Sequence, residues 1–237
     1  MKISRIPLLL ALLSLVLLGA SGLGVQLGWW AFPVGFQILR WVVYCGLAAV
    51  VVALLCMASP ALRRGAWAIL ILGLLIGAGV AFVPWRMAQQ AQALPRIHDI
   101  SSDLDNPPAF VAILPLRAGA ANPAEYGGPE IAAEQRRGYP DIVPLTLPIP
   151  TASAYAKALS VVKKNGWEIV ADDPVGGRIE ATATTRWFGF KDDVVVRVLG
   201  VTGGSRIDMR SVSRVGKSDV GANARRIRDF FEAINAS

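Results

Sequence analysis

The acidic residues of this 237-residue chain are confined to its C-terminal part, because no Asp or Glu precedes Asp99. Within the acid-free region, residues 6–39, 41–62 and 65–85 carry no charge at all. Each stretch is long enough to cross a bilayer, since about 20 apolar residues in a helix span the hydrocarbon core. The sequence therefore predicts a membrane domain over residues 1–94, with transmembrane helices at about 6–27, 38–58 and 65–85 and a short helical extension.

The basic residues of the membrane domain predict its orientation. Lys2 and Arg5 precede the first apolar stretch, and Arg63 and Arg64 lie between the second and the third. Short loops that carry Lys and Arg stay in the cytoplasm. We therefore expect a multi-pass membrane protein, with a cytoplasmic N-terminus and a C-terminal domain outside the cytoplasm.

The first apolar stretch has a second interpretation, as a cleavable signal peptide. Two basic residues precede a leucine-rich run that reaches the small residues Gly19, Ala20 and Ser21. The apolar run continues toward Trp29, which is longer than an ordinary signal peptide and favours a membrane span. Under either interpretation the C-terminal domain lies outside the cytoplasm.

The net charge of +7 does not indicate nucleic-acid binding, because of where the excess lies. From Pro95 onward the 18 Lys and Arg residues are almost balanced by 17 Asp and Glu. Cys45 and Cys56 both fall in the second apolar stretch, so the exported part has no thiol for a disulfide or a metal site. We expect no cofactor, and the sequence does not predict an oligomeric state.

Residues 95–237 are expected to form one exported unit with two parts. Residues 95–142 predict an irregular segment with a short helix over 129–137, because Pro129 begins it and Gly138 ends it. In residues 143–237, alternation predicts a strand, then a helix from Thr151 or Ser153, then four strands in two hairpins, then a helix from about residue 218. The predicted fold class is a three-helix transmembrane anchor followed by an α+β domain, with an antiparallel sheet and both helices on one face.

The same alternation leaves the other face of the sheet polar, and we expect that face to meet solvent. Its members are Arg178, Glu180, Thr182, Thr184, Arg197, Arg206, Asp208 and Arg210. Between the two hairpins lies an aromatic segment over residues 186–190, which is expected to close the end of the core, with a bilayer contact or an apolar pocket as alternatives. The residues predicted to bind a partner are Arg186, Trp187, Phe188, Phe190, Arg197, Arg206 and Arg210. If that surface binds nothing, the loop over residues 99–108 is the next candidate.

Two groups of residues are candidates for metal binding or catalysis. His98 with Asp99, Asp103 and Asp105 has oxygen and nitrogen donors for a cation, but this spacing is also typical of a capped turn, which we favour. His98 is the only histidine, which leaves few ways to build a nucleophile and a base. The acidic pairs at 172–173 and 192–193 flank turns, where such pairs are common. We therefore assign no metal ligand and no catalytic residue.

Several unusual strings carry a family resemblance over about residues 96–235. They are Ile97-His-Asp-Ile-Ser, Asn106-Pro-Pro-Ala-Phe, Tyr139-Pro-Asp-Ile, Gly166-Trp-Glu-Ile, Thr184-Thr-Arg-Trp-Phe-Gly-Phe-Lys-Asp-Asp, and Arg210-Ser-Val-Ser-Arg-Val-Gly-Lys-Ser-Asp. Together they resemble the bacterial domain of unknown function numbered fourteen ninety-nine. The resemblance implies an envelope-anchored domain, and with the predicted orientation this means a protein of the bacterial inner membrane whose C-terminal domain lies in the periplasm or otherwise outside the cytoplasm. It implies no activity, cofactor or site residue.

Two hypotheses about function follow from these observations. The first is a membrane-anchored cell-envelope protein whose exported domain is a binding or scaffolding module, with an envelope protein or an anionic lipid as partner besides the bilayer itself. The alternative is an envelope enzyme that acts on lipid or glycan through paired carboxylates, which requires two acids about 5 to 10 Å apart in one cleft. The first is favoured because the sequence offers no set of nucleophile and base, so an enzyme is the less expected outcome.

Overall fold

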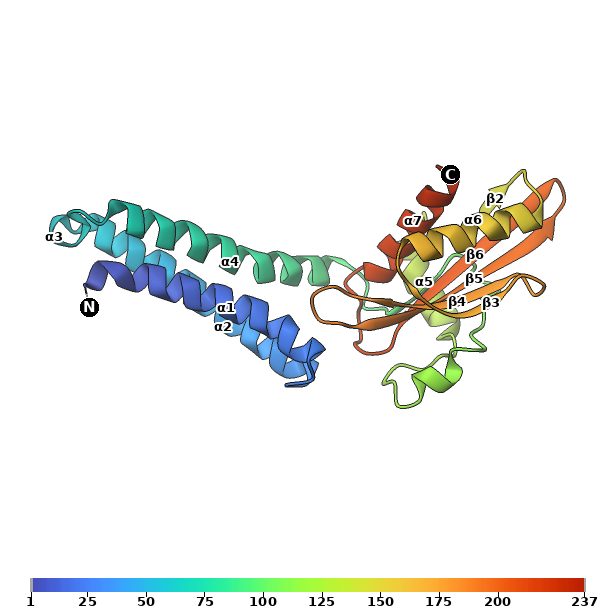
Figure 1. Cartoon of the computed structure of the whole chain (residues 1–237), viewed down its shortest axis with the longest axis horizontal. Helices are drawn as coiled ribbons and strands as arrows, with labels where there is room; N and C mark the ends of the chain where they lie inside the picture. The colour runs from blue at the N-terminus through green and yellow to red at the C-terminus, as the bar shows by residue number, and fades with distance from the viewer. Residues whose placement is uncertain (1, 237) are drawn as a thin grey trace. The chain divides into compact units, whose positions relative to one another are not determined.

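The structure is a computed structural model that describes residues 2–236, and its chain divides into two compact units (Figure 1). The first unit comprises Met1–Gln92 together with Arg186–Gly189. The second comprises Ala93–Thr185 and Phe190–Ser237. The first unit therefore holds the predicted membrane domain, and the second holds almost all of the predicted exported domain.

Three long apolar helices form the first unit, as the sequence predicts. They are α1 (Ile6–Gln26), α2 (Phe32–Ala58) and α4 (Trp67–Ala93), with the short elements η1 (Ile3–Arg5) and α3 (Pro60–Arg63) beside them. All three are long and apolar enough to cross a membrane. Helix α2 begins earlier than predicted because Pro33 lies in its first turn, where the missing N–H costs nothing.

Small residues let the helices of this unit approach one another closely. A Cβ atom added to Gly77 of α4 would lie 2.8 Å from the carbonyl oxygen of Gly46 of α2. Ser14 on α1 donates a 2.7 Å hydrogen bond to the carbonyl oxygen of Val42 on α2. Both contacts are of the kind that associates helices in lipid, where burial of apolar surface alone supplies no driving force.

The second unit is built on an antiparallel sheet of six strands. The strands are β1 (Asp99–Ser101), β2 (Leu145–Leu147), β3 (Glu168–Asp173), β4 (Arg178–Thr184), β5 (Lys191–Val201) and β6 (Gly204–Ser213). Their order is β1-β6-β5-β4-β3, and β2 also pairs with β6. The predicted α+β class, the antiparallel sheet and the two hairpins are confirmed, and β1 is an additional strand inside the segment that was expected to be irregular.

Helices α6 (Thr151–Lys164) and α7 (Ala222–Asn235) lie on one face of this sheet (Figure 1). The core between them consists of the alternate apolar residues of the strands and the apolar stripes of both helices, and includes Val196, Ile207 and Met209. Trp167 stacks on Phe230 of α7 with ring centroids 5.9 Å apart. This layer is the one that the alternating pattern predicts.

The outer edge of the sheet is interrupted. Both β1 and β2 pair with β6 in the same direction, β1 with residues 210–212 and β2 with residues 205–207. Between them the chain leaves the sheet after Ser101 and returns at Leu145, and it forms η2 (Leu114–Arg117) and α5 (Gly128–Gly138) on the way. We call residues 102–126 of this excursion the cover segment.

The expectation that the polar face of the sheet meets solvent is wrong, because the cover segment lies on it. The polar face was predicted to meet solvent, yet Glu180, Thr182, Asp208 and Arg210 are buried. Thr184 is the one member of the predicted set that is exposed, and the other three are partly buried. The physical reason is that the cover segment packs on this face and supplies groups that pair with its charges.

Candidate functional site

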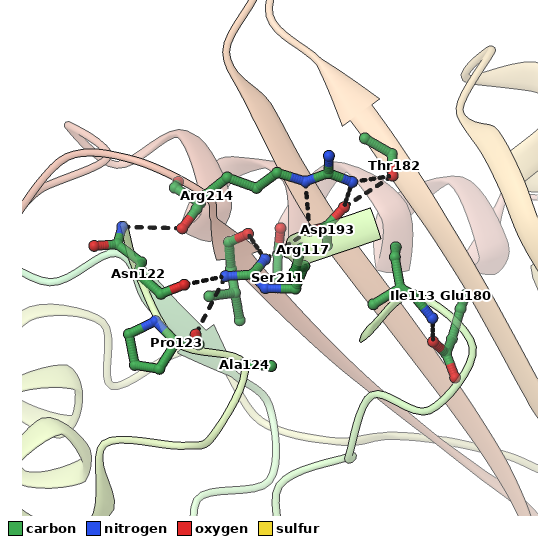
Figure 2. Close-up of polar contacts among 12 residues, drawn as sticks. Ile113, Arg117, Asn122, Pro123, Ala124, Glu180, Thr182, Asp193, Ser211 and Arg214 are labelled. Carbon is green, nitrogen blue, oxygen red and sulfur yellow. Dashed lines mark hydrogen bonds and ion pairs between the residues drawn. The ribbon is translucent and has the colours of Figure 1, made fainter. Parts of the chain in front are cut away.

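Asp193 on β5 joins the cover segment to the sheet (Figure 2). Arg117 of η2 donates a 2.6 Å hydrogen bond to Asp193 Oδ2, and Arg214 donates to both oxygens of the same carboxylate at 2.9 and 2.8 Å. Thr182 donates to Oδ1 at 2.8 Å. Although burial raises the pKa of Asp193, these hydrogen bonds from Arg214, Thr182 and Arg117 lower it to below its ordinary value. Asp193 is therefore a buried, ionised anchor.

Glu180 on β4 holds the neighbouring part of the cover segment through its backbone. The N–H groups of Val111 and Ala112 donate to Glu180 Oε1 at 3.0 and 3.2 Å, and that of Ile113 donates to Oε2 at 2.9 Å. Three successive amides around one carboxylate form an anion-binding concavity, here filled from within the protein. Because Glu180 is fully buried, its carboxylate is not accessible to a partner in solution and instead holds the cover segment in place.

A third group lies where the cover segment begins. Asp103 Oδ2 accepts hydrogen bonds from Arg197 at 3.0 Å and from Arg206 at 2.6 Å. Both arginines also contact Asp208, Arg197 at 2.8 Å and Arg206 at 2.9 Å. Burial alone would raise the pKa of Asp103. Hydrogen bonds from the backbone N–H groups of Asn106 and Asp105, and then the charges of Arg206 and Arg197, lower it to below its ordinary value. Arg197 and Arg206 therefore lie close together, around the carboxylates of Asp103 and Asp208.

Arg210 on β6 lies a little farther along the same face and is fully engaged. Its guanidinium group forms two hydrogen bonds with Asp99, of 2.8 and 2.7 Å, and donates to the carbonyl oxygens of Pro108 and Ala124. The rings of Phe110 and Tyr126 lie on its faces, 5.1 and 5.4 Å from the guanidinium carbon. Arg210 thus binds the cover segment rather than a partner from solution.

Apolar contact between the cover segment and the sheet is small by comparison. It consists of Phe110 and Ile113 from the cover segment packed on Val195 and Val212 of the sheet, with Ala124 and Val170 at its margin. The ionic contacts of this face join six arginines to six carboxylates: Arg117, Arg178, Arg197, Arg206, Arg210 and Arg214 to Asp99, Asp103, Asp173, Glu180, Asp193 and Asp208. Charge pairing is therefore the main specific interaction on this side of the sheet.

The aromatic segment of the predicted binding set lies elsewhere. Arg186, Trp187 and Phe188 are in the connection between β4 and β5 and belong to the first unit, not to the sheet unit. Arg186 is exposed, Trp187 and Phe190 are partly buried and Phe188 is buried. The core clusters of the sheet unit do not include these residues, so the interpretation that this segment closes that core stays a prediction.

The acidic groups weighed for catalysis or metal binding have other partners. Asp99 and Asp103 bind arginines as described, and Asp105 pairs with Arg136 at 2.9 Å. Within residues 2–236, no three side chains of His, Cys, Asp or Glu come together as a metal site would need.

The two acidic pairs are likewise engaged. Asp172 accepts a 2.5 Å hydrogen bond from the Tyr155 hydroxyl, and Asp192 pairs with Arg226 at 2.6 Å. Burial, followed by the hydrogen bond to Asp172, raises the pKa of Tyr155. Since Asp193 is also bound, neither pair offers two free carboxylates.

An open groove of about 510 Å³ remains on the sheet unit. It lies at the interrupted edge, because its walls come from the residues just after β1 and just before β2. Its lining is Ser102, Asp103, Leu104, Asp105, Asn106, Arg136, Tyr139, Pro140, Ile142, Val143, Pro144 and Arg206. We call this cavity the edge groove.

The edge groove combines apolar walls with balanced charges. Val143 is 57 % exposed, while Arg136 and Asp105 form an ion pair at the rim with side chains 56 % and 91 % exposed. Arg206 is one-third exposed, and its guanidinium group remains paired with Asp103 and Asp208. Such a surface can bind a ligand through apolar contact and hydrogen bonds.

Sequence reasoning named only part of this groove. Arg206 was in the predicted binding set, and the loop over 99–108 was named as the next place to search. Arg136 and Val143 were missed, because no periodic pattern links α5 and the chain before β2 to a strand edge. The available signal was the pair of proline-containing stretches at 106–108 and 140–144, which is typical of irregular backbone at a surface.

Comparison with known protein families gives one match. Residues 99–234 match the family described as "Protein of unknown function (DUF1499)". The matched range begins at β1 and ends within α7, so it contains the sheet, both helices of the core, the cover segment and the edge groove. No curated protein matches the chain.

Proposed function

We propose that this protein is a membrane-anchored binding module of the cell envelope. The chain belongs to the DUF1499 family of proteins of unknown function. The helices α1, α2 and α4 would hold the module at the membrane. The sheet unit would bind a partner in the edge groove. The partner that fits best is a segment of another envelope protein, since the groove offers apolar walls and both signs of charge.

One observation carries this proposal. The charges of the sheet unit's polar face are paired internally, whereas the edge groove is left open with Leu104, Val143 and the Arg136–Asp105 pair around it. A concave surface that combines polar groups with apolar ones can serve as a binding site. Of the residues expected to bind, Arg206 contributes directly, and Arg197 supports it through their shared contacts with Asp103 and Asp208.

The membrane and compartment belong to the same proposal. Lys2, Arg5, Arg63 and Arg64 favour an N-terminus in the cytoplasm of a bacterial cell and a sheet unit on the periplasmic side of the inner membrane. A reporter enzyme that works only outside the cytoplasm, fused after residue 237, is expected to be active. Activity of a reporter that works only in the cytoplasm at that position would contradict the orientation.

Arg186, Trp187, Phe188 and Phe190 take a different role in this proposal. Trp favours the level of the lipid headgroups, and residues 186–189 belong to the unit of membrane helices. We assign this segment to contact with the bilayer interface, including anionic headgroups for the exposed Arg186. It would assist anchoring, and the edge groove would select the partner.

The enzymatic alternative has weaker support. Hydrolysis of a lipid or glycan through paired carboxylates needs two acids free to exchange protons with substrate. Asp193 binds Arg117 and Arg214, Asp192 binds Arg226, and Asp172 binds Tyr155. A pair that is already neutralised by arginine is poorly suited to that chemistry.

Photo-crosslinking in intact cells tests the binding proposal. A photoreactive amino acid at Val143, inside the edge groove, is expected to give a discrete adduct with one envelope protein. The matched control is Val175, which is 99 % exposed in the turn between β3 and β4 and lies outside the groove. The adduct at position 143 should weaken with Arg136→Glu and persist with Arg225→Glu, which changes an exposed arginine of α7. Equal labelling at positions 143 and 175 would contradict a binding role for the groove.

A further inference from the structure

The central part of the cover segment is unusual in its lack of charge. Residues 106–124 contain a single charged residue, Arg117, and its side chain is buried against Asp193. In the same stretch Val111, Leu114 and Leu116 are 52 %, 45 % and 50 % exposed. We call residues 111–118 the apolar loop. Exposed apolar surface of this kind marks a contact with a membrane or a protein.

Buried contacts on the inner side explain why the leucines point outward. The short helix η2 spans only Leu114–Arg117, and its orientation is set by Ile113, which precedes it, and by Arg117, which ends it. Ile113 and Arg117 face the sheet, where Ile113 packs on Val195 and Val212 and Arg117 binds Asp193. Leu114 and Leu116, which lie between these two inward residues, are left on the outer surface. The outward position is therefore fixed by buried contacts on the inner side.

The backbone of the apolar loop is also suited to an environment poor in water. The N–H groups of Val111, Ala112 and Ile113 donate to Glu180, as described above. The N–H of Leu116 donates to the carbonyl oxygen of Ile113, and that of Ala118 donates to that of Pro115. Backbone donors that are already satisfied lower the cost of entering an apolar phase.

The chain itself keeps the sheet unit near a lipid surface. Helix α4 ends at Ala93 and β1 begins at Asp99, so only residues 94–98 connect them. Five residues span at most about 18 Å when fully extended. The sheet unit is thus tethered to the membrane helices by a short connection, whereas a protein partner would have to be recruited. We propose that the apolar loop inserts Leu114 and Leu116 into the bilayer surface, as a contact separate from the edge groove and independent of its function.

Depth-dependent fluorescence quenching in vesicles tests this proposal on the full chain. In a background with Cys45→Ala and Cys56→Ala, Leu116→Cys would carry an environment-sensitive fluorophore. The protein would be reconstituted into vesicles of phosphatidylcholine and phosphatidylglycerol, with and without lipids that bear a nitroxide on the acyl chain. The label at position 116 is expected to show blue-shifted emission and quenching several-fold stronger than the same label at Val175→Cys. Val175 is a matched control because it is apolar and more exposed, yet lies between Asp173 and Arg178.

Two further measurements separate the outcomes. A label at Val111→Cys should behave like that at position 116, and circular dichroism should show that the labelled variants keep the fold. Quenching at positions 111 and 116 no greater than at 175, in folded protein, would overturn the proposal. Crosslinking of position 116 to a protein in native membranes, without quenching in vesicles, would also overturn it and assign the apolar loop to a protein contact.

Discussion

The two faces of the sheet are both interior surfaces, but they are covered by different means. One face packs apolar residues such as Val196 and Ile207 against α6 and α7. The other is the polar face, which we call the ionic face because its charges are paired. It is closed by the cover segment, which is held by Asp103, Arg117 and the amides that bind Glu180. The apolar face tolerates many arrangements because burial of apolar area has no direction. The ionic face specifies one arrangement, because each charge needs a partner at hydrogen-bond distance.

This difference has a consequence for function. A buried ionic surface resembles a catalytic or binding site in sequence, since it collects Arg, Asp and Glu on adjacent strands. Here those residues pair with one another and with the cover segment, and the proposed partner site is the edge groove, where the edge strand is interrupted. The largest concentration of charge is therefore not the best candidate site.

Removing the central anchor of the ionic face is expected to have the largest effect. Asp193→Ala leaves Arg117 and Arg214 without their carboxylate, and loss of one partner of a buried ion pair costs about 3–5 kcal/mol. The measurement is urea denaturation of residues 95–237, which we expect to unfold cooperatively without the membrane helices. Asp229→Ala removes an exposed acid from α7 and serves as control. A cost for Asp193→Ala below about 1 kcal/mol would mean that the cover is held mainly by apolar contact.

Lowering the pH is expected to weaken the ion pairs of the ionic face, whereas the apolar contacts of the other face do not depend on protonation. The pKa values of Asp193 and Asp103 are lowered in the folded protein, so their contribution to stability is present above their unfolded pKa of about 4 and is lost as the pH falls through the folded values. The free energy of unfolding should therefore decrease below about pH 4. Asp103→Asn should make that decrease shallower, measured by denaturation across a pH series. An unchanged slope in the variant would contradict the assignment.

Two tyrosines with buried hydroxyl groups, one on each side of the sheet, allow the two faces to be compared, with a smaller expected effect. Tyr126 lies against Arg210 on the ionic side and Tyr139 lies in the apolar core, and neither hydroxyl has a hydrogen-bond partner among the described residues. Burial raises the pKa of both to about 12. Since the ordinary value is 10.0, the unfolded chain ionises first, and stability should fall as the pH rises from 10 to 12.

Each Tyr→Phe variant removes a buried, unpaired hydroxyl group. Tyr126→Phe and Tyr139→Phe should each be neutral or stabilising by about 1 kcal/mol at neutral pH, and each should reduce the alkaline loss. Thermal denaturation at pH 7 and pH 11 gives both quantities. If Tyr126→Phe destabilises the protein and Tyr139→Phe does not, the Tyr126 hydroxyl group makes a hydrogen bond on the ionic face, contrary to the expectation.

The exposed ion pair at the rim of the edge groove should contribute least to stability. Arg136 and Asp105 are largely solvated, so Arg136→Ala is expected to change the free energy of unfolding by less than about 1 kcal/mol. The same urea series measures it. A larger loss would indicate that the rim belongs to the folded core and is not free to bind a partner.

The fold was predictable where a periodic pattern repeats over several residues. Alternation in β4, where Ile179 and Ala181 face the helices and Glu180 and Thr182 face away, predicts two different faces. It cannot predict what covers the second face, because the cover segment has no period and its contacts join residues far apart, such as Asp103 with Arg206. Strand β1 was missed because its three residues are too few for a pattern, and with it the interrupted edge that creates the groove.

Hydrogen exchange of the amides that bind Glu180 distinguishes an interior polar face from an exposed one most directly. In the full chain in detergent, the N–H groups of Val111, Ala112 and Ile113 should exchange as slowly as those in the centre of β5, since a buried carboxylate holds them. The turn at Val175 supplies the fast reference. Slow exchange at residues 111–113 is the expected result, and exchange as fast as at Val175 would mean that the cover segment is open and that the polar face meets solvent.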